Sequence, residues 1–319
     1  MKDIEEYLMK KNYLTKAPRT PIEKSKILLT GPVRNVASKI EQEVENLLAS
    51  FANFNETKCF VIESDSTDNT VKKLEELSQK IANFSFISMG QLSSKYPRRT
   101  DRIAFCRNAA IDAVASNPAL ADIDYIAMAD MDGMNSLVTP EKIAECWTVE
   151  QEWDVITANQ LGEYYDIWAL RHPDWSPNDC WQQKTALEPV IGRHFAENLA
   201  ITAKQVVLDP SVGLIEVDSA FGGLAIYRRS AFLAGRYAGT DKRSGFDVAD
   251  HIPFHEDLRA QGYKIYINSR LINCARYPDA VEPNLPQKPR GTLKVIQRIG
   301  KAVFGKKRFN KYLDLMKTP

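Results

Sequence analysis

Short apolar runs alternate with stretches of helical periodicity through the first half of this chain. The runs have the length of buried strands and lie at residues 26–30, 59–62, 84–88 and 124–129. Apolar side chains recur at the spacing of one helix face over residues 37–54, 70–81 and 103–115. Strands that alternate with helices predict an α/β fold, in which a mostly parallel sheet is flanked by helices. Ligands of such sheets bind beyond the carboxyl ends of the strands.

The second half of the chain is less regular. A short helix is predicted at 252–261, a loop-like stretch at 162–183 holds three tryptophans, and further strands are predicted at 153–157, 220–227 and 264–268. We therefore expect one large α/β domain with a segment at each end. The expected divisions are a lead-in over residues 1–25, two halves of the domain over 26–150 and 151–280, and a tail over 281–319.

Polar sequences follow the second and fourth predicted strands, at residues 63–69 and 130–133. They occupy strand ends at which a ligand would bind. Neither contains the G-x-G-x-x-G pattern of dinucleotide-binding folds or the G-x-x-x-x-G-K-[ST] phosphate loop. The sequence therefore supports neither a dinucleotide site nor a P-loop, and another class of ligand is expected there.

Three groups of residues, taken in order, resemble the GT-A-type nucleotide-sugar glycosyltransferases of the family-two kind. They are the acidic turn Glu63–Thr70, the helical pair Arg107-Asn108 followed by Asp130-Met-Asp132, and the later segments 164–171, 221–223 and 250–258. The later segments look closest to the capsular mannosyltransferase-like branch. A D-x-D motif alone is weakly specific, whereas this ordered set, spread over residues 26–275, is fairly specific.

The resemblance implies a Rossmann-like GT-A sheet and a metal-dependent hexosyltransferase that uses Mn²⁺ or Mg²⁺. It also implies a nucleotide-sugar donor and a surface-glycan or lipid-linked acceptor, as in capsule or lipopolysaccharide synthesis. The chain departs from the branch at Asp250-His251, where Glu followed by Cys or His is usual, and at Ser269, where Pro is usual. Only the reaction class is therefore carried over.

Two other functions stay open. A sugar nucleotidyltransferase also uses a related α/β sheet and Mg²⁺, but it would need a glycine-rich basic loop directly after the first strand. The segment Gly31–Arg34 is a poor version of such a loop. The second alternative is a catalytically silent scaffold that recruits a glycan-assembly complex to a membrane.

Several side chains at the strand ends are candidates for binding the donor. Cleavage of a sugar–phosphate bond develops negative charge, which a divalent ion or an arginine can neutralise. Asp130 and Asp132 point to the same side of an extended strand, so we expect Asp132 on the metal and Asp130 on the ribose or a metal-bound water. An acidic turn at a strand end is the alternative. The remaining donor-binding candidates are Arg34, Glu63, Asp65, Arg102 and Arg107.

For some of these donor candidates, a structural role that needs no ligand is the alternative to donor binding. The turn after Glu63 has the composition of a helix cap, so we assign capping to Asp68 and donor binding to Glu63. Arg102 belongs to a run of cations of the kind that commonly forms a solvated face. Arg107 differs because it lies in a mostly apolar helix, where an unpaired charge is costly. It needs an anionic partner, which is either a buried carboxylate such as Asp130 or the ligand.

The second half of the chain supplies the candidates for catalysis and acceptor binding. Asp250 is expected to act as a general base or charge stabiliser near the acceptor, and His251 as a metal or diphosphate ligand. Trp168 lies in an irregular polar loop where it could stack on a sugar ring, and Gly222 and Gly223 permit close approach of an acceptor. The structural alternatives are an ordinary helix histidine, core packing and a β-bulge.

The charge distribution points to a membrane surface rather than to nucleic acid. The net charge is +1, but residues 288–319 hold about ten Lys and Arg against one acid, so the rest of the chain is acidic. This tail also has apolar residues on one helical stripe, the pattern of a helix lying on an anionic membrane. A helix packed on the domain is the alternative. No nucleic-acid partner is expected, because the basic stripe is on the tail and not on the folded body.

Cysteine content and hydropathy bear on the compartment. The five cysteines form no C-x-x-C pair and are odd in number, which favours a reducing cytoplasm over a zinc or disulfide framework. The N-terminus has no apolar segment of signal-peptide length, and no run of 18 apolar residues occurs. We therefore expect a cytoplasmic protein held peripherally on the inner face of the cytoplasmic membrane.

Overall fold

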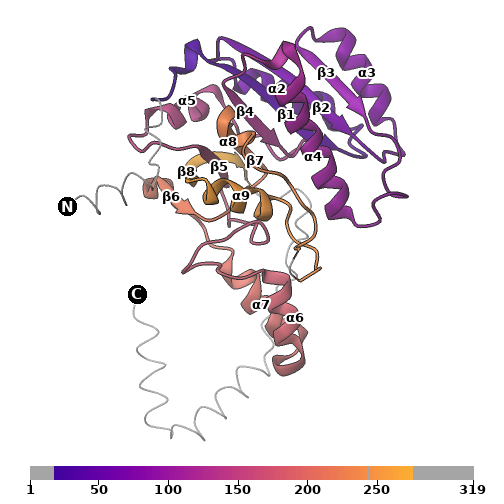
Figure 1. Cartoon of the computed structure of the whole chain (residues 1–319). Coiled ribbons are helices and arrows are strands. Elements are labelled where there is room, and N and C mark those ends of the chain that lie inside the picture. The colour runs from indigo at the N-terminus through magenta and orange to yellow at the C-terminus, as the bar shows by residue number, and fades with distance from the viewer. Residues whose placement is uncertain (1–17, 243, 276–319) are drawn as a thin grey trace, which may run out of the picture. The chain divides into compact units, whose positions relative to one another are not determined.

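Strands from both halves of the chain join one sheet, with helices on its two faces (Figure 1). The computed structural model describes residues 18–242 and 244–275. The chain divides into two compact units, Met1–Pro278 and Asp279–Pro319. The second unit lies wholly outside the described residues, as does the beginning of the predicted lead-in. The helix predicted for the basic tail therefore stays a prediction.

The first half of the chain forms the parallel part of the sheet. Its strands lie side by side in the order β3-β2-β1-β4, and every pairing among them is parallel. Their carboxyl ends therefore meet at one edge. The strands are β1 (Lys26–Val33), β2 (Glu56–Glu63), β3 (Phe84–Ser88) and β4 (Tyr125–Ala129), and the helices between them are α2 (Ile40–Ser50), α3 (Thr70–Lys80) and α4 (Arg99–Ser116).

The second half extends this sheet beyond β4. The order continues β7-β5-β8-β6, with β7 antiparallel to both β4 and β5, and with β6 antiparallel to β8. The strands are β5 (Val155–Gln160), β6 (Leu214–Val217), β7 (Leu224–Arg228) and β8 (Ile265–Cys274). The remaining helices of the described chain are α5 (Pro140–Thr148), which precedes this half, and α6 (Cys180–Ile191), α7 (Arg193–Ala200), α8 (Arg229–Phe232) and α9 (His251–Ala260).

Two apolar clusters hold the layers together. Alternate residues of β1 face opposite sides of the sheet, so Leu28 joins one cluster, while Ile27 and Leu29 join the other. The cluster that contains Leu28 includes side chains of α4, α8 and α9. The opposite cluster includes side chains of α2, α3 and α5. The sheet is thus covered on both faces, as parallel sheets require.

The predicted α/β fold with a mostly parallel sheet flanked by helices is confirmed. Four of the seven strand pairings in the described residues are parallel. None of the described helices is both long and apolar enough to span a bilayer. All five cysteines are free and buried, in agreement with the absence of paired cysteines in the sequence.

Several element boundaries differ from the predicted ones. β1 does not stop at Thr30 but continues to Val33, because Gly31 and Pro32 stay extended and pair with β2. β7 starts at Leu224 instead of residue 220, after a glycine turn. The loop predicted before residue 103 is partly helical, since α4 begins at Arg99. Helices α5, α6, α7 and α8 and strand β6 were not predicted.

Candidate active site

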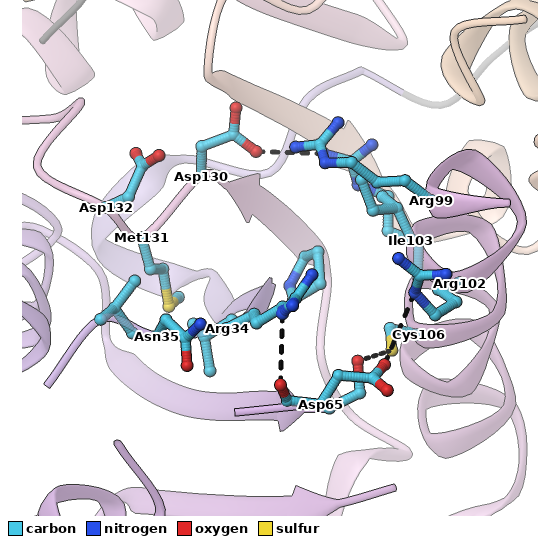
Figure 2. Close-up of a pocket in the computed structure, with 15 residues that line it drawn as sticks. Arg34, Asn35, Asp65, Arg99, Arg102, Ile103, Cys106, Asp130, Met131 and Asp132 are labelled. Atoms are coloured by element: carbon cyan, nitrogen blue, oxygen red, sulfur yellow. Dashed lines mark hydrogen bonds and ion pairs between the residues drawn. The ribbon is translucent and has the colours of Figure 1, made fainter. Parts of the chain in front are cut away.

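A cleft of about 490 Å³ opens where β1, β2 and β4 end and where α4 begins (Figure 2). Its lining is dominated by charge. Asp130 and Asp132 lie across the space from Arg99 and Arg102. The charged side chains that line the cleft are Arg34, Arg99, Arg102, Arg107, Asp65, Asp130 and Asp132. Apart from Arg99, these are six of the predicted site residues, and the structure brings them together.

Two loops that form one wall of the cleft are locked to each other. The Asn35 amide donates to Ser66 Oγ at 3.0 Å, and the Thr67 amide donates back to Asn35 Oδ1 at 2.8 Å. Asp68 links the loops as well, since its carboxylate accepts from the amides of Ala37 and Thr70. The capping role predicted for Asp68 thus agrees with its contact to the first residue of α3. These bonds hold the wall in place without a ligand.

Asn35 and Asp65 have left-handed backbone conformations, with φ of 53° and 56°. They are the non-glycine residues of the described chain with positive φ, and both line the cleft. Such conformations are uncommon outside glycine and gather at functional sites, where surrounding contacts maintain them. Both left-handed non-glycine residues of the described chain therefore lie at the cleft.

Asp65 is a buried carboxylate at the bottom of the cleft. Its Oδ1 accepts from the Ser93 amide at 2.9 Å, and its Oδ2 lies 3.6 Å from Arg102 Nε. Burial acts to raise the pKa of Asp65, but the Ser93 hydrogen bonds and the charge of Arg102 outweigh it and lower the pKa. Arg34 also donates, from Nε to the Asp65 carbonyl at 3.2 Å. Asp65 therefore remains an ionised acceptor beside two arginines.

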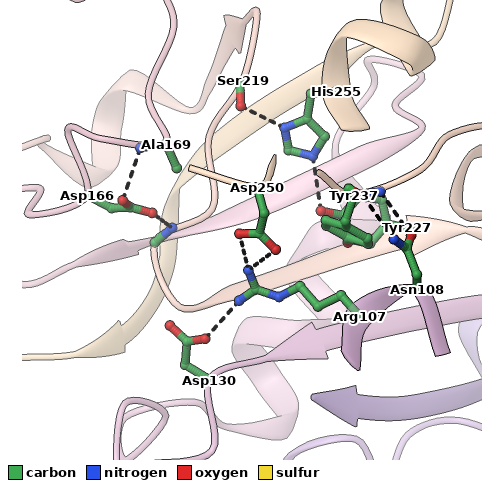
Figure 3. A network of polar contacts seen from close by, with 11 residues as sticks. Arg107, Asn108, Asp130, Asp166, Ala169, Ser219, Tyr227, Tyr237, Asp250 and His255 are labelled. Atoms are coloured by element: carbon green, nitrogen blue, oxygen red, sulfur yellow. Dashed lines mark hydrogen bonds and ion pairs between the residues drawn. The ribbon is translucent and has the colours of Figure 1, made fainter. Parts of the chain in front are cut away.

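Arg107 joins the two halves of the domain (Figure 3). Its Nη2 lies 3.1 Å from Asp130 Oδ1, at the end of β4. Its Nη1 donates to both oxygens of Asp250, at 2.6 and 2.8 Å, directly before α9. The guanidinium also lies 4.9 Å from the centroid of the Phe221 ring. Arg107, which needs an anionic partner because it lies in an apolar helix segment, thus has two, Asp130 and Asp250.

Asp130 sits in a crowded electrostatic environment. Burial raises its pKa to about 7, and the carboxylates of Asp132, Asp166 and Asp250 act in the same direction, while Arg107 opposes them. Arg107 itself has a raised pKa: burial would lower it, but Asp250 and Asp130 stabilise the charged form. The site therefore holds more carboxylates than its one buried arginine can neutralise.

Asp250 was predicted to be a catalytic base. In this structure both of its oxygens accept from Arg107, and the residue is only 7% exposed. It lies outside the residues that line the cleft, although it contacts one of them. The contacts therefore favour charge stabilisation, which was the other half of the prediction, over proton transfer.

The structure does not place His251 in the cleft with Asp132. The His251 ring is stacked on Phe221, with centroids 3.9 Å apart, and its nitrogens have no hydrogen-bond partner among the described residues. Burial lowers its pKa well below the ordinary value, with a further contribution from Arg107. His255, one turn on, is a core residue held by Ser219 Oγ at 2.9 Å and Tyr227 Oη at 3.0 Å.

Two further candidates have contacts within the protein instead of in the cleft. The Glu63 carboxylate accepts from the Ser66 amide and from Ser88 Oγ, so it holds its own turn together. Trp168 packs against the core and donates from Nε1 to Asp179 at 3.1 Å. These contacts agree with the structural alternatives, and donor binding by Glu63 and acceptor binding by Trp168 stay predictions.

Gly222 and Gly223 form the turn before β7, with φ of 66° and 87°. A Cβ on Gly222 would lie 2.7 Å from the Ala158 carbonyl oxygen, so the close approach at this position is to β5. The Gly223 carbonyl accepts from the Asp130 amide at 2.9 Å. The predicted acceptor-binding glycines therefore position Asp130 and the adjoining strand.

Sequence reasoning left out three residues that build the site. Arg99 lines the cleft and belongs to the same cation run as Arg102; its place one helical turn before Arg102 was the available signal. Asp166 accepts from the amides of Ala169 and Gly222 and faces the same carboxylate cluster. Asn135 holds the loop after β4 by donating to the Asp130 carbonyl at 2.8 Å.

The carboxylates of the cleft have the chemistry of a site for a hard cation. Asp130 and Asp132 supply oxygen donors, which Mg²⁺ and Mn²⁺ prefer. Within the described residues, no three His, Cys, Asp or Glu side chains gather so that they could hold a metal ion by themselves. The remaining ligands would be oxygens of a bound diphosphate and water, which is how Mg²⁺ is commonly held. The residues present therefore fit an ion that binds together with a ligand.

Comparison with known proteins gave matches among solved structures alone. No family model matches the chain, and no curated protein matches it. The mannosyltransferase PcManGT from Pyrobaculum calidifontis, in complex with GDP-Man and Mn²⁺, aligns with a TM-score of 0.46 and 15% identity over 93% of this chain and 68% of that one. S. aureus TarS 1-349 with UDP-GlcNAc has a TM-score of 0.43 and 14% identity, over 79% and 59%.

A third similar structure is glucosyl-3-phosphoglycerate synthase from Mycobacterium tuberculosis in complex with uridine diphosphate. Its TM-score is 0.40, with 15% identity over 82% of this chain and 77% of that one. Because none of these identities exceeds 15%, we infer the function from the residues of the cleft.

Proposed function

We propose that this chain is a metal-dependent glycosyltransferase that moves a hexose from a nucleoside-diphosphate sugar to an acceptor. The observation that carries the proposal is the cleft at the strand ends, where Arg99 and Arg102 face Asp130 and Asp132. Guanidinium groups and the start of α4 suit a diphosphate, because both present N–H donors and positive charge. A divalent ion held at Asp132, with Asp130 beside it, would neutralise charge on the departing diphosphate.

Each part of the cleft has a place in this proposal. Asp65 is an ionised acceptor suited to ribose or base donors. Arg34, on the rim, is suited to the phosphates. Arg107 holds Asp130 and Asp250 in fixed positions, so the charge pattern exists before the donor arrives. Such preorganisation lowers the cost of stabilising the leaving group.

The alternative of a sugar nucleotidyltransferase is disfavoured by the path of β1. That enzyme class would need a flexible glycine loop after the first strand. Gly31 is instead extended within β1, and a Cβ there would lie 2.1 Å from the Ala129 carbonyl oxygen. This glycine therefore serves the packing of β1 against β4 and not a phosphate loop.

The acceptor and the location are finer parts of the proposal. We propose a surface-glycan or lipid-linked acceptor, as in capsule or lipopolysaccharide synthesis, and a peripheral position on the inner face of the cytoplasmic membrane. The support is the basic, amphipathic sequence at residues 288–319, which lies outside the described residues.

A thermal-shift panel tests the proposal. Nucleoside diphosphates and nucleotide sugars are each added with and without Mn²⁺, because a ligand that binds the native state raises Tm. We expect a rise that needs both one nucleotide and the metal, equivalent to about 2.7 kcal/mol at a ligand concentration of 100 Kd. Asp132→Ala should lose the metal-dependent part of the rise and the metal-dependent release of nucleoside diphosphate, with its ligand-free Tm unchanged.

The matched control is Asp174→Ala, which removes an exposed aspartate outside the cleft. This variant should behave like the parent protein. Turnover by Asp132→Ala equal to that of the parent would remove Asp132 from the site. Absence of any nucleotide-dependent rise would instead favour the scaffold function.

A further inference from the structure

The helical hairpin α6–α7 exposes large apolar side chains to solvent. Figure 1 shows the two helices side by side at the margin of the described fold. The described side chains that they bury fully are small, namely Cys180, Ala196 and Ala200. The large apolar side chains that they expose are Trp181, Val190, Ile191, Phe195 and Leu199. The hairpin therefore exposes large apolar side chains, while the side chains that it buries fully are small.

This exposure is concentrated at the turn between the helices. Every residue from 189 to 195 is exposed, with the sequence Pro-Val-Ile-Gly-Arg-His-Phe, and we call this segment the hairpin tip. Val190 is 80% exposed and Phe195 is 60% exposed. The tip contains no acid, and it carries Arg193 and His194 between its apolar side chains. The adjoining acid Glu188 is paired with Lys184 at 3.0 Å.

The base of the hairpin is attached firmly to the domain. Asp179, which caps α6, accepts from Trp168 Nε1 and pairs with Arg171 at 3.0 Å. At the other end, the Lys204 ammonium donates to Gln183 at 2.7 Å. The hairpin tip therefore extends from a base that polar contacts attach to the domain, unlike the tip of a loosely attached loop.

We propose that the hairpin tip inserts into the headgroup region of an anionic lipid bilayer. Apolar side chains beside the cation Arg193, without acids, match a bilayer surface, which has negatively charged headgroups above an apolar interior. A second copy of this chain is a poorer fit, because a contact between two tips would place two Arg193 side chains and no acid in one interface. The inference goes beyond glycosyl transfer, since it would hold for a silent scaffold too.

A fluorescent probe on the tip tests the proposal in the full chain. Val190→Cys is labelled with an environment-sensitive thiol dye and mixed with vesicles rich in phosphatidylglycerol, or with vesicles of phosphatidylcholine alone. Labelling is selective, because all five native cysteines are buried and burial raises the pKa of each thiol. The control position is Val212→Cys, which is 57% exposed on another element.

We expect the dye at residue 190 to shift its emission to the blue with anionic vesicles, and the dye at residue 212 to stay unchanged. Three results would overturn the proposal. One is absence of vesicle binding. Another is vesicle binding with no change at residue 190, which would assign binding to another segment. The third is a blue shift that grows with protein concentration without vesicles, which would indicate contact between copies.

A charge variant gives a second readout. Val190→Asp combined with Phe195→Asp should weaken binding to anionic vesicles by about tenfold or more, because it puts acids into the apolar part of the tip. Val212→Asp should leave vesicle binding unchanged. The nucleotide-dependent rise in Tm should be the same in all these proteins, so failure of the membrane proposal is distinguishable from failure of the glycosyltransferase proposal.

Discussion

At the scale of single residues, the site depends on a buried arginine. Arg107 lies in an apolar stretch of α4 and pairs with Asp130, directly after β4, and with Asp250, directly before α9. A buried ion pair of this kind is not strong evidence for stability by itself. Loss of one member is costly, however, because the partners are left as unpaired charges away from water.

We therefore expect Arg107→Met to lower the free energy of unfolding by about 3–5 kcal/mol. The matched control is Arg236→Met, which removes an arginine whose ion pair with Asp112 is equally short, 2.6 Å, but exposed on both sides. That change should cost about 1 kcal/mol or less. Urea titration of both variants measures the difference, and equal losses would show that Asp130 and Asp250 gain no stability from Arg107.

The sequence predicted part of this residue-level picture. An arginine among apolar helix residues signals a buried partner, and Asp130 was identified. The second partner, Asp250, lies 143 positions away, and no local pattern reports such a contact. Glu63 differs from Asp250, because its place at a strand end was predicted correctly. The direction of its carboxylate could not be predicted, because it depends on hydrogen bonds with Ser66 and Ser88.

At the scale of elements, the turn before β7 holds the start of this antiparallel strand in place. Gly222 has a left-handed backbone and its carbonyl accepts from Gln160 and Asn273, in β5 and β8. The turn thus connects three strands at the edge of the site. A side chain there would meet both backbone strain and the Ala158 carbonyl.

Gly222→Ala should therefore lower stability by more than backbone strain alone, which is about 1–2 kcal/mol. Gly245→Ala is the matched control, since its φ of 70° is similar but no atom lies within 4 Å of an added Cβ. Thermal unfolding should rank Gly222→Ala below Gly245→Ala. The reverse order would mean that β5 can move away from the turn at little cost.

Regular elements were easier to predict than irregular ones. The strands and helices of the first half follow clear periodicities, and their order gave the sheet type. Helix α5 has the usual start signals, Thr139 as cap and Pro140 in the first turn, which apolar periodicity alone does not reveal. Strand β6 has only four residues and one buried side chain, so its existence depends on the pairing with β8 and not on its own sequence.

At the scale of the whole molecule, a core histidine links folding to pH. His255 is fully buried between Ser219 and Tyr227, and burial, together with Arg107, lowers its pKa to about 3. The unfolded chain has a histidine pKa near 6.5 and so takes up the proton first as pH falls. The contribution of His255 to stability is therefore complete above that value and is lost progressively below it.

Between pH 7.5 and 5, the parent protein should lose about 2 kcal/mol more stability than His255→Gln, counted from each protein's own value at pH 7.5. His194→Gln, at an exposed position, should follow the parent. The measurement is the unfolding free energy by urea titration at each pH. Parallel curves for the parent and His255→Gln would refute the linkage.

The central place of β7 has a consequence for synthesis of the chain. Its partner β4 is complete at Ala129, but β7 begins only at Leu224. A ribosome adding 5–20 residues per second needs about 5–20 s for the intervening stretch. During that interval β4, whose five residues are all buried in the final fold, has an unpaired apolar edge. Until β7 has been synthesised, the nascent protein therefore carries a strand edge of the kind that can pair with another chain.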